Sequence, residues 1–190
     1  VSEPRIAAAI VTMNKRDALL TLLARLGEEQ IPAFVTTNAC SDGTPDAVRA
    51  AFPAVTVLES AHNLGGTGGF NCAMLAALEA QPRYLALIDD DALPDRGCLA
   101  QLADFLDAHP EAGIAGSYVH GPEPVPHKTA FRFPNIGGEL EASLGIGVIS
   151  ALLEPWIVAP PLPTQTCEVD WLAGASMMIR RSVLEEVGLF

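Results

Sequence analysis

Short apolar runs alternate with amphipathic segments along the first part of the chain. The apolar runs have the length of strands and predict strands at residues 5–12, 31–37, 54–59, 84–88 and 113–119. The segments between them repeat apolar residues every three or four positions and predict helices at residues 14–27, from residue 44, at 68–81 and at 95–109. This alternation predicts an α/β fold.

Local signals mark where several helices begin. Asn14 is expected to cap the first helix, and Pro45 stands at the first position of the second, where its missing N–H leaves no bond unmade. Ser182 begins a capping-box pattern for a last helix that is expected to end at Gly188. These signals add helix boundaries to the pattern of apolar positions.

Each predicted strand is apolar along nearly its whole length, so both of its faces are expected to be buried. Such strands are typical of a mostly parallel sheet with helices on both faces. The carboxyl ends of parallel strands meet at one edge, where ligands bind. Four polar or glycine-rich segments fall at that edge, at residues 12–14, 38–43, 62–69 and 89–91. Their convergence predicts a binding site.

The charge of the chain restricts its ligands. The net charge is -12, so no nucleic-acid partner is expected, and an anionic ligand would be repelled unless a cation or local donors intervened. The four cysteines include no C-x-x-C pair, which argues against a zinc site or a disulfide framework. Together with the lack of a recognisable leader, they favour a reducing, cytoplasmic compartment.

Three adjacent carboxylates, those of Asp89, Asp90 and Asp91, follow the strand predicted at residues 84–88. Side by side they repel one another and lose hydration, and a bound Mg²⁺ or Mn²⁺ would relieve both costs. Because alternate side chains of an extended segment point the same way, Asp89 and Asp91 are expected to share the metal. The alternative is a solvated turn in which Asp91 caps the next helix.

A glycine-rich segment, NLGGTGGFN, occupies residues 63–71. Its four glycines would let the backbone approach a ligand and would present N–H groups to an anion at a helix N-terminus. The segment is neither a dinucleotide fingerprint nor a P-loop. A flexible turn before a helix is the alternative.

The other polar loops carry weaker signals. The candidate nucleotide contacts there are Thr12, Asn14, Lys15, Asn38 and Asp42. An ordinary turn or a helix cap explains the same residues at least as well. Trp171 with Gly174 could form a platform for a sugar ring, although a buried Trp in a strand is the commoner outcome.

These motifs, in this order, resemble the family 2 glycosyltransferases with the GT-A fold. The resemblance rests on T-x-N at 12–14, N-x-x-S-D-G-T at 38–44, N-L-G-G-x-G-G at 63–69, D-D-D at 89–91 and D-W-x-x-G-A at 170–175. The segment NLGGTGGF followed by DDD is most similar to bacterial galactofuranosyltransferases of cell-wall synthesis. The end of the chain is equally similar to rhamnosyltransferases of polysaccharide assembly.

The resemblance implies a Rossmann-like GT-A sheet and a metal-dependent, inverting transfer of a sugar from UDP-galactofuranose or a similar donor. A polysaccharide or lipid-linked glycan of the cell envelope would be the acceptor. Mn²⁺ or Mg²⁺ would be held by Asp89 and Asp91, as in a DXD motif. The implied donor contacts are Thr12, Asn14, Lys15, Asn38, Asp42, Asn63, Gly65, Gly66, Asp89 and Asp90. Trp171 and Gly174 would contact the acceptor.

We expect one domain over residues 1–190, with a nucleotide-sugar-binding half at 1–119 and an incomplete acceptor-binding half at 120–190. Prolines make residues 120–166 irregular, with a helix expected at 140–153. The family's catalytic base follows a Val-Gly-x-Phe stretch, so we expect it beyond Phe190, in a longer protein. This piece is then expected to bind donor and to transfer sugar slowly or not at all.

Three other functions stay open. They are a transferase that uses dTDP-rhamnose, a non-catalytic module that binds nucleotide-sugars, and a nucleotidyltransferase that releases pyrophosphate. The apolar residues 144–163 could contact the inner face of the plasma membrane or could pack internally. The oligomeric state does not follow from the sequence.

Overall fold

A computed structural model describes residues 3–121, 126–144 and 152–190. The chain forms two compact units, the first comprising Val1–Ala115 with Gly174–Phe190 and the second comprising Gly116–Ala173. Because the last stretch of chain returns to the first unit, these bounds differ from those of the two halves expected from the sequence. The functional meaning of the halves stays a prediction.

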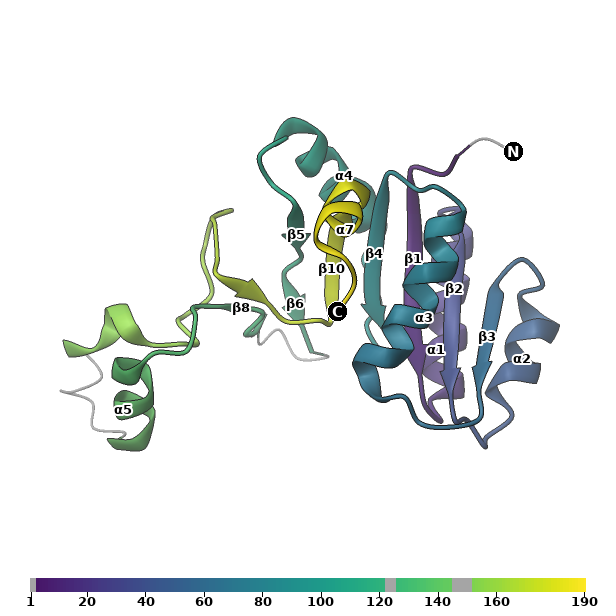
Figure 1. Ribbon diagram of the computed structural model, residues 1–190, viewed down its shortest axis with the longest axis horizontal. Coiled ribbons are helices and arrows are strands. Elements are labelled where there is room, and N and C mark those ends of the chain that lie inside the picture. The colour runs from purple at the N-terminus through teal and green to yellow at the C-terminus, as the bar shows by residue number, and fades with distance from the viewer. Residues whose placement is uncertain (1–2, 122–125, 145–151) are drawn as a thin grey trace. The chain divides into compact units, whose positions relative to one another are not determined.

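The first unit contains a six-stranded sheet with the order β3-β2-β1-β4-β10-β5. Its strands are β1 (Ile6–Thr12), β2 (Ala33–Asn38), β3 (Thr56–Ser60), β4 (Tyr84–Asp89), β5 (Ile114–Gly116) and β10 (Ser176–Arg180). β1 is parallel to β2 and β4, β2 is parallel to β3, and β10 runs antiparallel to β4 (Figure 1). The mostly parallel sheet of the predicted α/β fold is therefore confirmed.

Helices cover both faces of this sheet. They are α1 (Arg16–Glu28), α2 (Thr44–Ala51), α3 (Gly65–Glu79), α4 (Cys98–Ala108) and α7 (Arg181–Val187). Ile6, Ala8 and Ile10 of β1 pack with side chains of α1, α2 and α4, whereas Ala7 and Ala9 pack with those of α3 and α7. The alternation of a strand thus explains why the sequence of β1 is apolar at every position from 6 to 11.

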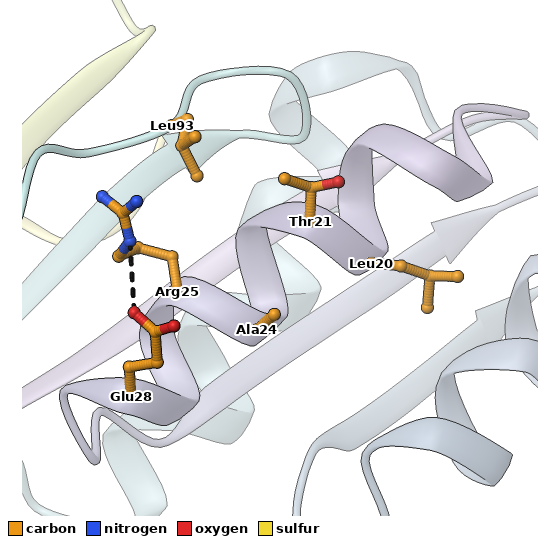
Figure 2. A pocket seen from close by; sticks show the side chains of 6 residues that line it. All are labelled: Leu20, Thr21, Ala24, Arg25, Glu28 and Leu93. Carbon is orange, nitrogen blue, oxygen red and sulfur yellow. Dashed lines mark ion pairs between the residues drawn. The ribbon is translucent and has the colours of Figure 1, made fainter.

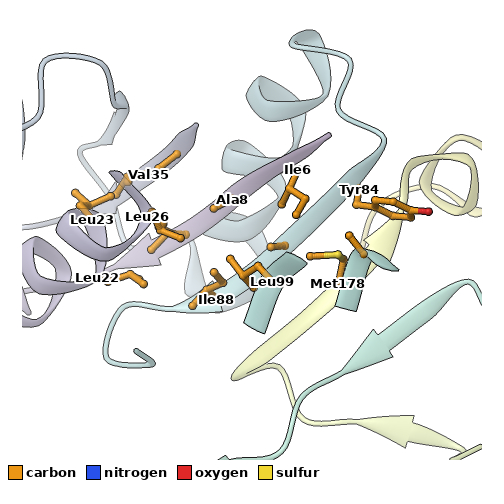
Figure 3. Packing of buried hydrophobic residues seen from close by; sticks show 14 of the residues in the cluster. Ile6, Ala8, Leu22, Leu23, Leu26, Val35, Tyr84, Ile88, Leu99 and Met178 are labelled. Atoms are coloured by element: carbon orange, nitrogen blue, oxygen red, sulfur yellow. The ribbon is translucent and has the colours of Figure 1, made fainter. Parts of the chain in front are cut away.

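The core on the first of these faces is close-packed and aliphatic. Figure 3 shows Leu22, Leu23 and Leu26 of α1 directed onto β1 and β2, with Leu99 of α4 beside Ile88. These side chains are all at most 2% exposed. The helices therefore hold the strands, and the ends of the strands, in fixed positions.

The helix boundaries differ from the predictions in two places. α3 begins at Gly65 rather than at residue 68. Gly65 itself has a φ of +70°, a conformation that glycine adopts at little cost. The predicted cap of α7 is wrong, since Arg180 precedes the helix and no side chain caps it. Pro45 and Gly188 mark a helix start and a helix end as predicted.

The second unit has only short elements. These are β6 (Val119–His120), β7 (Pro126–His127), β8 (Ala130–Phe131), α5 (Ile136–Leu144), η1 (Glu154–Trp156) and β9 (Trp171–Leu172). β6 pairs with β7 and β8 with β9, both antiparallel. Of the helix expected at residues 140–153, the first residues belong to α5, and residues 145–151 lie outside the described part. Within the described residues, none of the helices has the length and apolar character needed to cross a bilayer.

Candidate functional site

The four parallel strands β1 to β4 point the same way, and the segments that follow them meet at one edge of the sheet (Figure 1). Hydrogen bonds join the segments to one another. The bonds are Thr12 Oγ1 to Asp90 Oδ2 (2.7 Å), Ser41 N to Asn14 Oδ1 (2.8 Å) and Asn38 Nδ2 to Asn63 Oδ1 (2.9 Å). The convergence predicted from the order of elements is therefore present.

The three carboxylates of the acidic triplet have different surroundings. Asp90 is 7% exposed and accepts the hydrogen bond of the Thr12 hydroxyl, whereas Asp91 is exposed. Asp89 is half-buried, and no hydrogen-bond donor among the described residues reaches its carboxylate. Of the three, Asp89 is thus the carboxylate whose oxygens are left for a ligand.

The electrostatics of Asp89 fit a bound cation. Burial, followed by the like charges of Asp91 and Asp90, raises the pKa of its carboxyl group above the usual range for aspartate. A divalent cation would relieve this repulsion, and carboxylate oxygens are the ligands that Mg²⁺ and Mn²⁺ prefer. The described part of the chain has no group of three or more Cys, His, Asp or Glu arranged as metal ligands. Further ligands would therefore come from water or from the phosphates of a substrate.

Lys15 balances part of the triplet's charge. Its Nζ lies 2.6 Å from Asp91 Oδ2 and 3.4 Å from Asp90 Oδ1. The hydrogen bond to Asp91 and the charge of Asp90 raise the pKa of the Lys15 ammonium. Lys15, predicted as a nucleotide contact, is bound in this structure to the acidic triplet.

Asn14 does not cap α1, so that expectation is wrong. Its backbone has a φ of +56°, and its Oδ1 accepts the Ser41 N–H at 2.8 Å instead of an N–H of the helix. The residue before α1 is Lys15, which makes no side-chain cap. Asn14 tolerates the left-handed conformation better than most residues and uses it to join two loops of the site.

Asn38 fastens the glycine-rich segment to the sheet. The side chain is 4% exposed. Its Nδ2 donates to Asn63 Oδ1 (2.9 Å) and to the Gly65 carbonyl (3.1 Å), and its Oδ1 accepts the Leu64 N–H (2.8 Å). The amide is therefore occupied in positioning the start of α3, and its predicted contact with a nucleotide base stays a prediction.

The glycines of this segment serve two different purposes. A Cβ on Gly69 would lie 2.3 Å from Val11 Cγ2, so this glycine lets α3 pack closely on β1. A Cβ on Gly66 would meet nothing within 4 Å. Gly65 and Gly66 thus leave open space beside the N–H groups of the first turn of α3, as the prediction of an anion site requires.

Asp42 connects the loop between β2 and α2 to the first residues of α1 and α2. Its Oδ1 accepts the N–H of Thr44 at 3.1 Å and the hydroxyl of Thr44 at 2.5 Å, and its Oδ2 accepts the Arg16 N–H at 3.3 Å. The Thr44 hydroxyl is the main cause of the lowered pKa of this carboxyl group. Asp42 is therefore ionised near neutral pH and lies at the predicted edge.

Trp171 and Gly174, the predicted acceptor contacts, fall in different units of the chain. Trp171 is 41% exposed, stacks on Phe131 with ring centroids 4.2 Å apart, and donates from Nε1 to the Arg132 carbonyl at 3.0 Å. The commoner outcome, a buried Trp, is therefore not what the structure has. Nothing lies within 4 Å of a Cβ built on Gly174, which precedes β10.

The loop after Asp91 is fastened to the C-terminal half of α1, which the sequence analysis did not foresee. Arg25 Nη1 donates to the Pro94 carbonyl at 2.6 Å, and Glu29 Oε1 accepts the Gly97 N–H at 3.1 Å. A hollow of about 430 Å³ is lined by Leu20, Thr21, Ala24, Arg25, Glu28 and Leu93. Figure 2 shows these side chains. No local motif indicates these contacts, because the partners are far apart in the sequence.

Replacing Arg25 by Ala is expected to loosen this loop. The variant leaves the Pro94 carbonyl without its charged donor, and we expect the free energy of unfolding to fall by about 1–2 kcal/mol. Amide hydrogen exchange should become faster at residues 92–97 by a larger factor than in β2, where exchange follows the global free energy of unfolding. Arg49→Ala, which removes an exposed ion pair with Glu59, is the control. Unchanged exchange in the loop would contradict the anchoring role.

A profile of glycosyl transferase family 2 matches residues 8–188 of the chain. Over 186 residues the chain is 26% identical to the N-acetylglucosaminyl-diphospho-decaprenol L-rhamnosyltransferase of Mycobacterium tuberculosis, an alignment that covers 92% of this chain and 60% of that protein. The chain thus spans about three fifths of the length of the curated relatives that it matches.

Solved structures share the fold. The mannosyltransferase PcManGT from Pyrobaculum calidifontis, in complex with GDP-Man and Mn²⁺, has a TM-score of 0.61 and 23% identity, with 100% of this chain and 48% of that one covered. S. aureus TarS 1-349 in complex with UDP also has a TM-score of 0.61, at 16% identity, with 96% and 48% covered. At these identities the likeness concerns the fold.

Proposed function

Because the chain belongs to glycosyl transferase family 2, we propose that it binds a nucleotide-diphosphate sugar at the carboxyl edge of its sheet and transfers the sugar with the help of a divalent cation. One observation carries the proposal: the half-buried carboxylate of Asp89, without a donor, stands at the edge where the Gly65 turn opens α3. A diphosphate with its cation would bring opposite charge to the carboxylates and an anion to the helix.

Asp89 and Asp91 are the proposed holders of Mn²⁺ or Mg²⁺. When bound, the cation supplies a Lewis acid at the diphosphate of the leaving nucleotide. Asp90 accepts a hydrogen bond from the Thr12 hydroxyl. Its carboxylate is proposed to accept hydrogen bonds from the ribose hydroxyls of the donor as well. Asp42 and the Asn38 loop remain the proposed contacts of the base.

The first turn of α3 is the proposed contact of the diphosphate. The Gly65 N–H donates to Asn63 Oδ1 at 2.8 Å. The following N–H groups of the first turn have no partner within the helix, and the helix dipole adds positive potential there. The open space at Gly66 permits the close approach that these short bonds need. These backbone N–H donors would offset the repulsion between an anionic substrate and a chain of net charge -12.

The donor sugar is proposed to be rhamnose or a related hexose. The Mycobacterium tuberculosis relative is named as an L-rhamnosyltransferase, which favours a rhamnosyl donor over the galactofuranosyl donor also expected from the sequence. Its name also supports a lipid-linked diphosphate glycan as acceptor. Such an acceptor would bring the protein, from the cytoplasm, to the inner face of the plasma membrane. Inverting transfer, with a carboxylate as general base, completes the proposal.

Calorimetric titration of UDP and of dTDP, with and without Mn²⁺, tests the proposed site. We expect binding of one nucleotide to depend on Mn²⁺ and to weaken roughly 100-fold in Asp91→Ala, as removal of groups at metal sites does. The preferred base would identify the class of donor. A nucleotide affinity that is the same with and without Mn²⁺, and the same in wild type and Asp91→Ala, would rule out the carboxylates as the cation site. Assays of the bound nucleotide-sugar with acceptor then separate a transferase from a binding module.

A further inference from the structure

Lys15 binds Asp91, one of the two carboxylates proposed to hold the cation. Its ammonium lies 2.6 Å from Asp91 Oδ2 and 3.4 Å from Asp90 Oδ1, and these carboxylates are the only side chains that it bonds among the described residues. An ammonium and a divalent cation beside the same Asp91 carboxylate would repel one another strongly, because only a few ångströms would separate the two charges. The two cations therefore compete.

The structure allows the ammonium to leave without disturbing its surroundings. The Lys15 side chain is 49% exposed, while its carbonyl accepts the Leu19 N–H at 3.0 Å, which fixes the backbone at the start of α1. Asp90 keeps its bond from Thr12 Oγ1 at 2.7 Å when the lysine departs. Asp90 and Asp91 both lose their ion pair with Lys15, and Asp91 is one of the two carboxylates assigned to the cation.

A diphosphate at this edge would supply a new partner for the ammonium. The Lys15 amino group has three donors and a flexible stem, and phosphate oxygens are stronger attractors than an exposed carboxylate that it must share with a metal. Binding of the nucleotide would then favour binding of the cation, because the diphosphate draws the Lys15 ammonium away from the carboxylates.

We propose that Lys15 is a built-in counterion of the triplet, which holds the cation site closed until a nucleotide diphosphate draws the ammonium away. This inference rests on the proposed function, because it concerns the same carboxylates and the same diphosphate. Lys15 then sets the order of binding, because the protein alone binds the metal weakly and the bound nucleotide frees the carboxylates for the cation.

The test is Mn²⁺ binding, followed by the electron paramagnetic resonance signal of free Mn²⁺, in the absence and presence of saturating UDP or dTDP. Wild type should bind Mn²⁺ weakly alone and more tightly with one nucleotide. Lys15→Met should bind Mn²⁺ alone roughly tenfold more tightly than wild type, because a neighbouring positive charge is removed at a solvent-screened site. It should gain less from the nucleotide. Lys15→Arg, which keeps the charge, should behave as wild type does.

Lys128→Met is the matched control, since Lys128 lies in the second unit and its ammonium bonds the Ala159 carbonyl at 2.6 Å. It removes the same charge and should leave Mn²⁺ binding as in wild type. If Lys15→Met binds Mn²⁺ alone no more tightly than wild type, while wild type still binds it with nucleotide, the counterion role is overturned and the proposed function stands. Absence of Mn²⁺ binding to every variant with either nucleotide would overturn both.

Discussion

Asp89→Asn is expected to abolish metal-dependent nucleotide binding and, at the same time, to make the protein more stable. The affinity should fall at least roughly 100-fold, because the amide oxygen carries no net charge for the cation. Stability at neutral pH should rise by about 0.5 kcal/mol, after allowance for solvent screening at this half-exposed side chain. A gain in stability with a loss of binding is the signature of a carboxylate kept for function.

The stability gain has a defined pH dependence. The pKa of Asp89 is raised in the folded protein, so between the unfolded and folded values the folded state binds more protons. The free energy of unfolding of wild type therefore falls as pH rises through that window. Asp89→Asn does not lose stability in this window. The difference in free energy of unfolding between the variant and wild type should therefore be largest above the folded pKa and should vanish below the ordinary aspartate pKa of about 3.9.

Thermal melts at several pH values and calorimetric titration of nucleotide with Mn²⁺ measure the two effects. Asp95→Asn is the control, because Asp95 is exposed in the same loop and the substitution changes the charge equally. It should leave nucleotide affinity unchanged. A destabilised Asp89→Asn protein would mean that an unseen hydrogen bond holds this carboxylate, and retained Mn²⁺ dependence would place the cation elsewhere.

Gly69→Ala and Gly66→Ala are expected to act in opposite ways although both add one methyl group to the first turns of α3. The Cβ on residue 69 would lie 2.3 Å from Val11 Cγ2. Val11 is β-branched and cannot turn aside easily, so α3 must shift, at a cost of about 2 kcal/mol in the free energy of unfolding. The Cβ on residue 66 meets open space, and stability should stay level or rise by up to about 1 kcal/mol.

Nucleotide binding distinguishes the two glycines further. Gly66→Ala should weaken UDP or dTDP binding at unchanged stability, because its methyl group occupies the space through which a diphosphate would reach the N–H groups of α3. Urea denaturation and calorimetric titration on both variants provide the comparison. If Gly66→Ala binds nucleotide as wild type does, the diphosphate does not approach this turn. If Gly69→Ala is as stable as wild type, the close packing on Val11 is relieved at little cost.

Within the acidic triplet, the sequence indicated the chemistry and the structure assigned the roles. Three adjacent aspartates after a buried run, together with the other polar loops at the same sheet edge, favoured a cation site over a solvated turn. Alternation suggested that Asp90 would point away from the other two, but Asp90 and Asp91 lie in a turn after β4, and both approach the Lys15 ammonium. That Asp89 lacks a donor and Asp91 is held by Lys15 depends on side chains brought together from distant positions. Local sequence carries no signal for such partners.

The sequence by itself determined the class of fold and the convergence of the polar segments at the carboxyl edge of the sheet, because strand burial and helix periodicity are local and parallel strands all end at one edge. The tertiary structure alone decided the antiparallel place of β10 beside β4, the bond from Ser41 that keeps Asn14 from capping α1, and the Arg25 anchor of the loop after Asp91. Each of these joins residues at least 27 positions apart. Such contacts form only when the packed helices and strands bring their partners within hydrogen-bond reach.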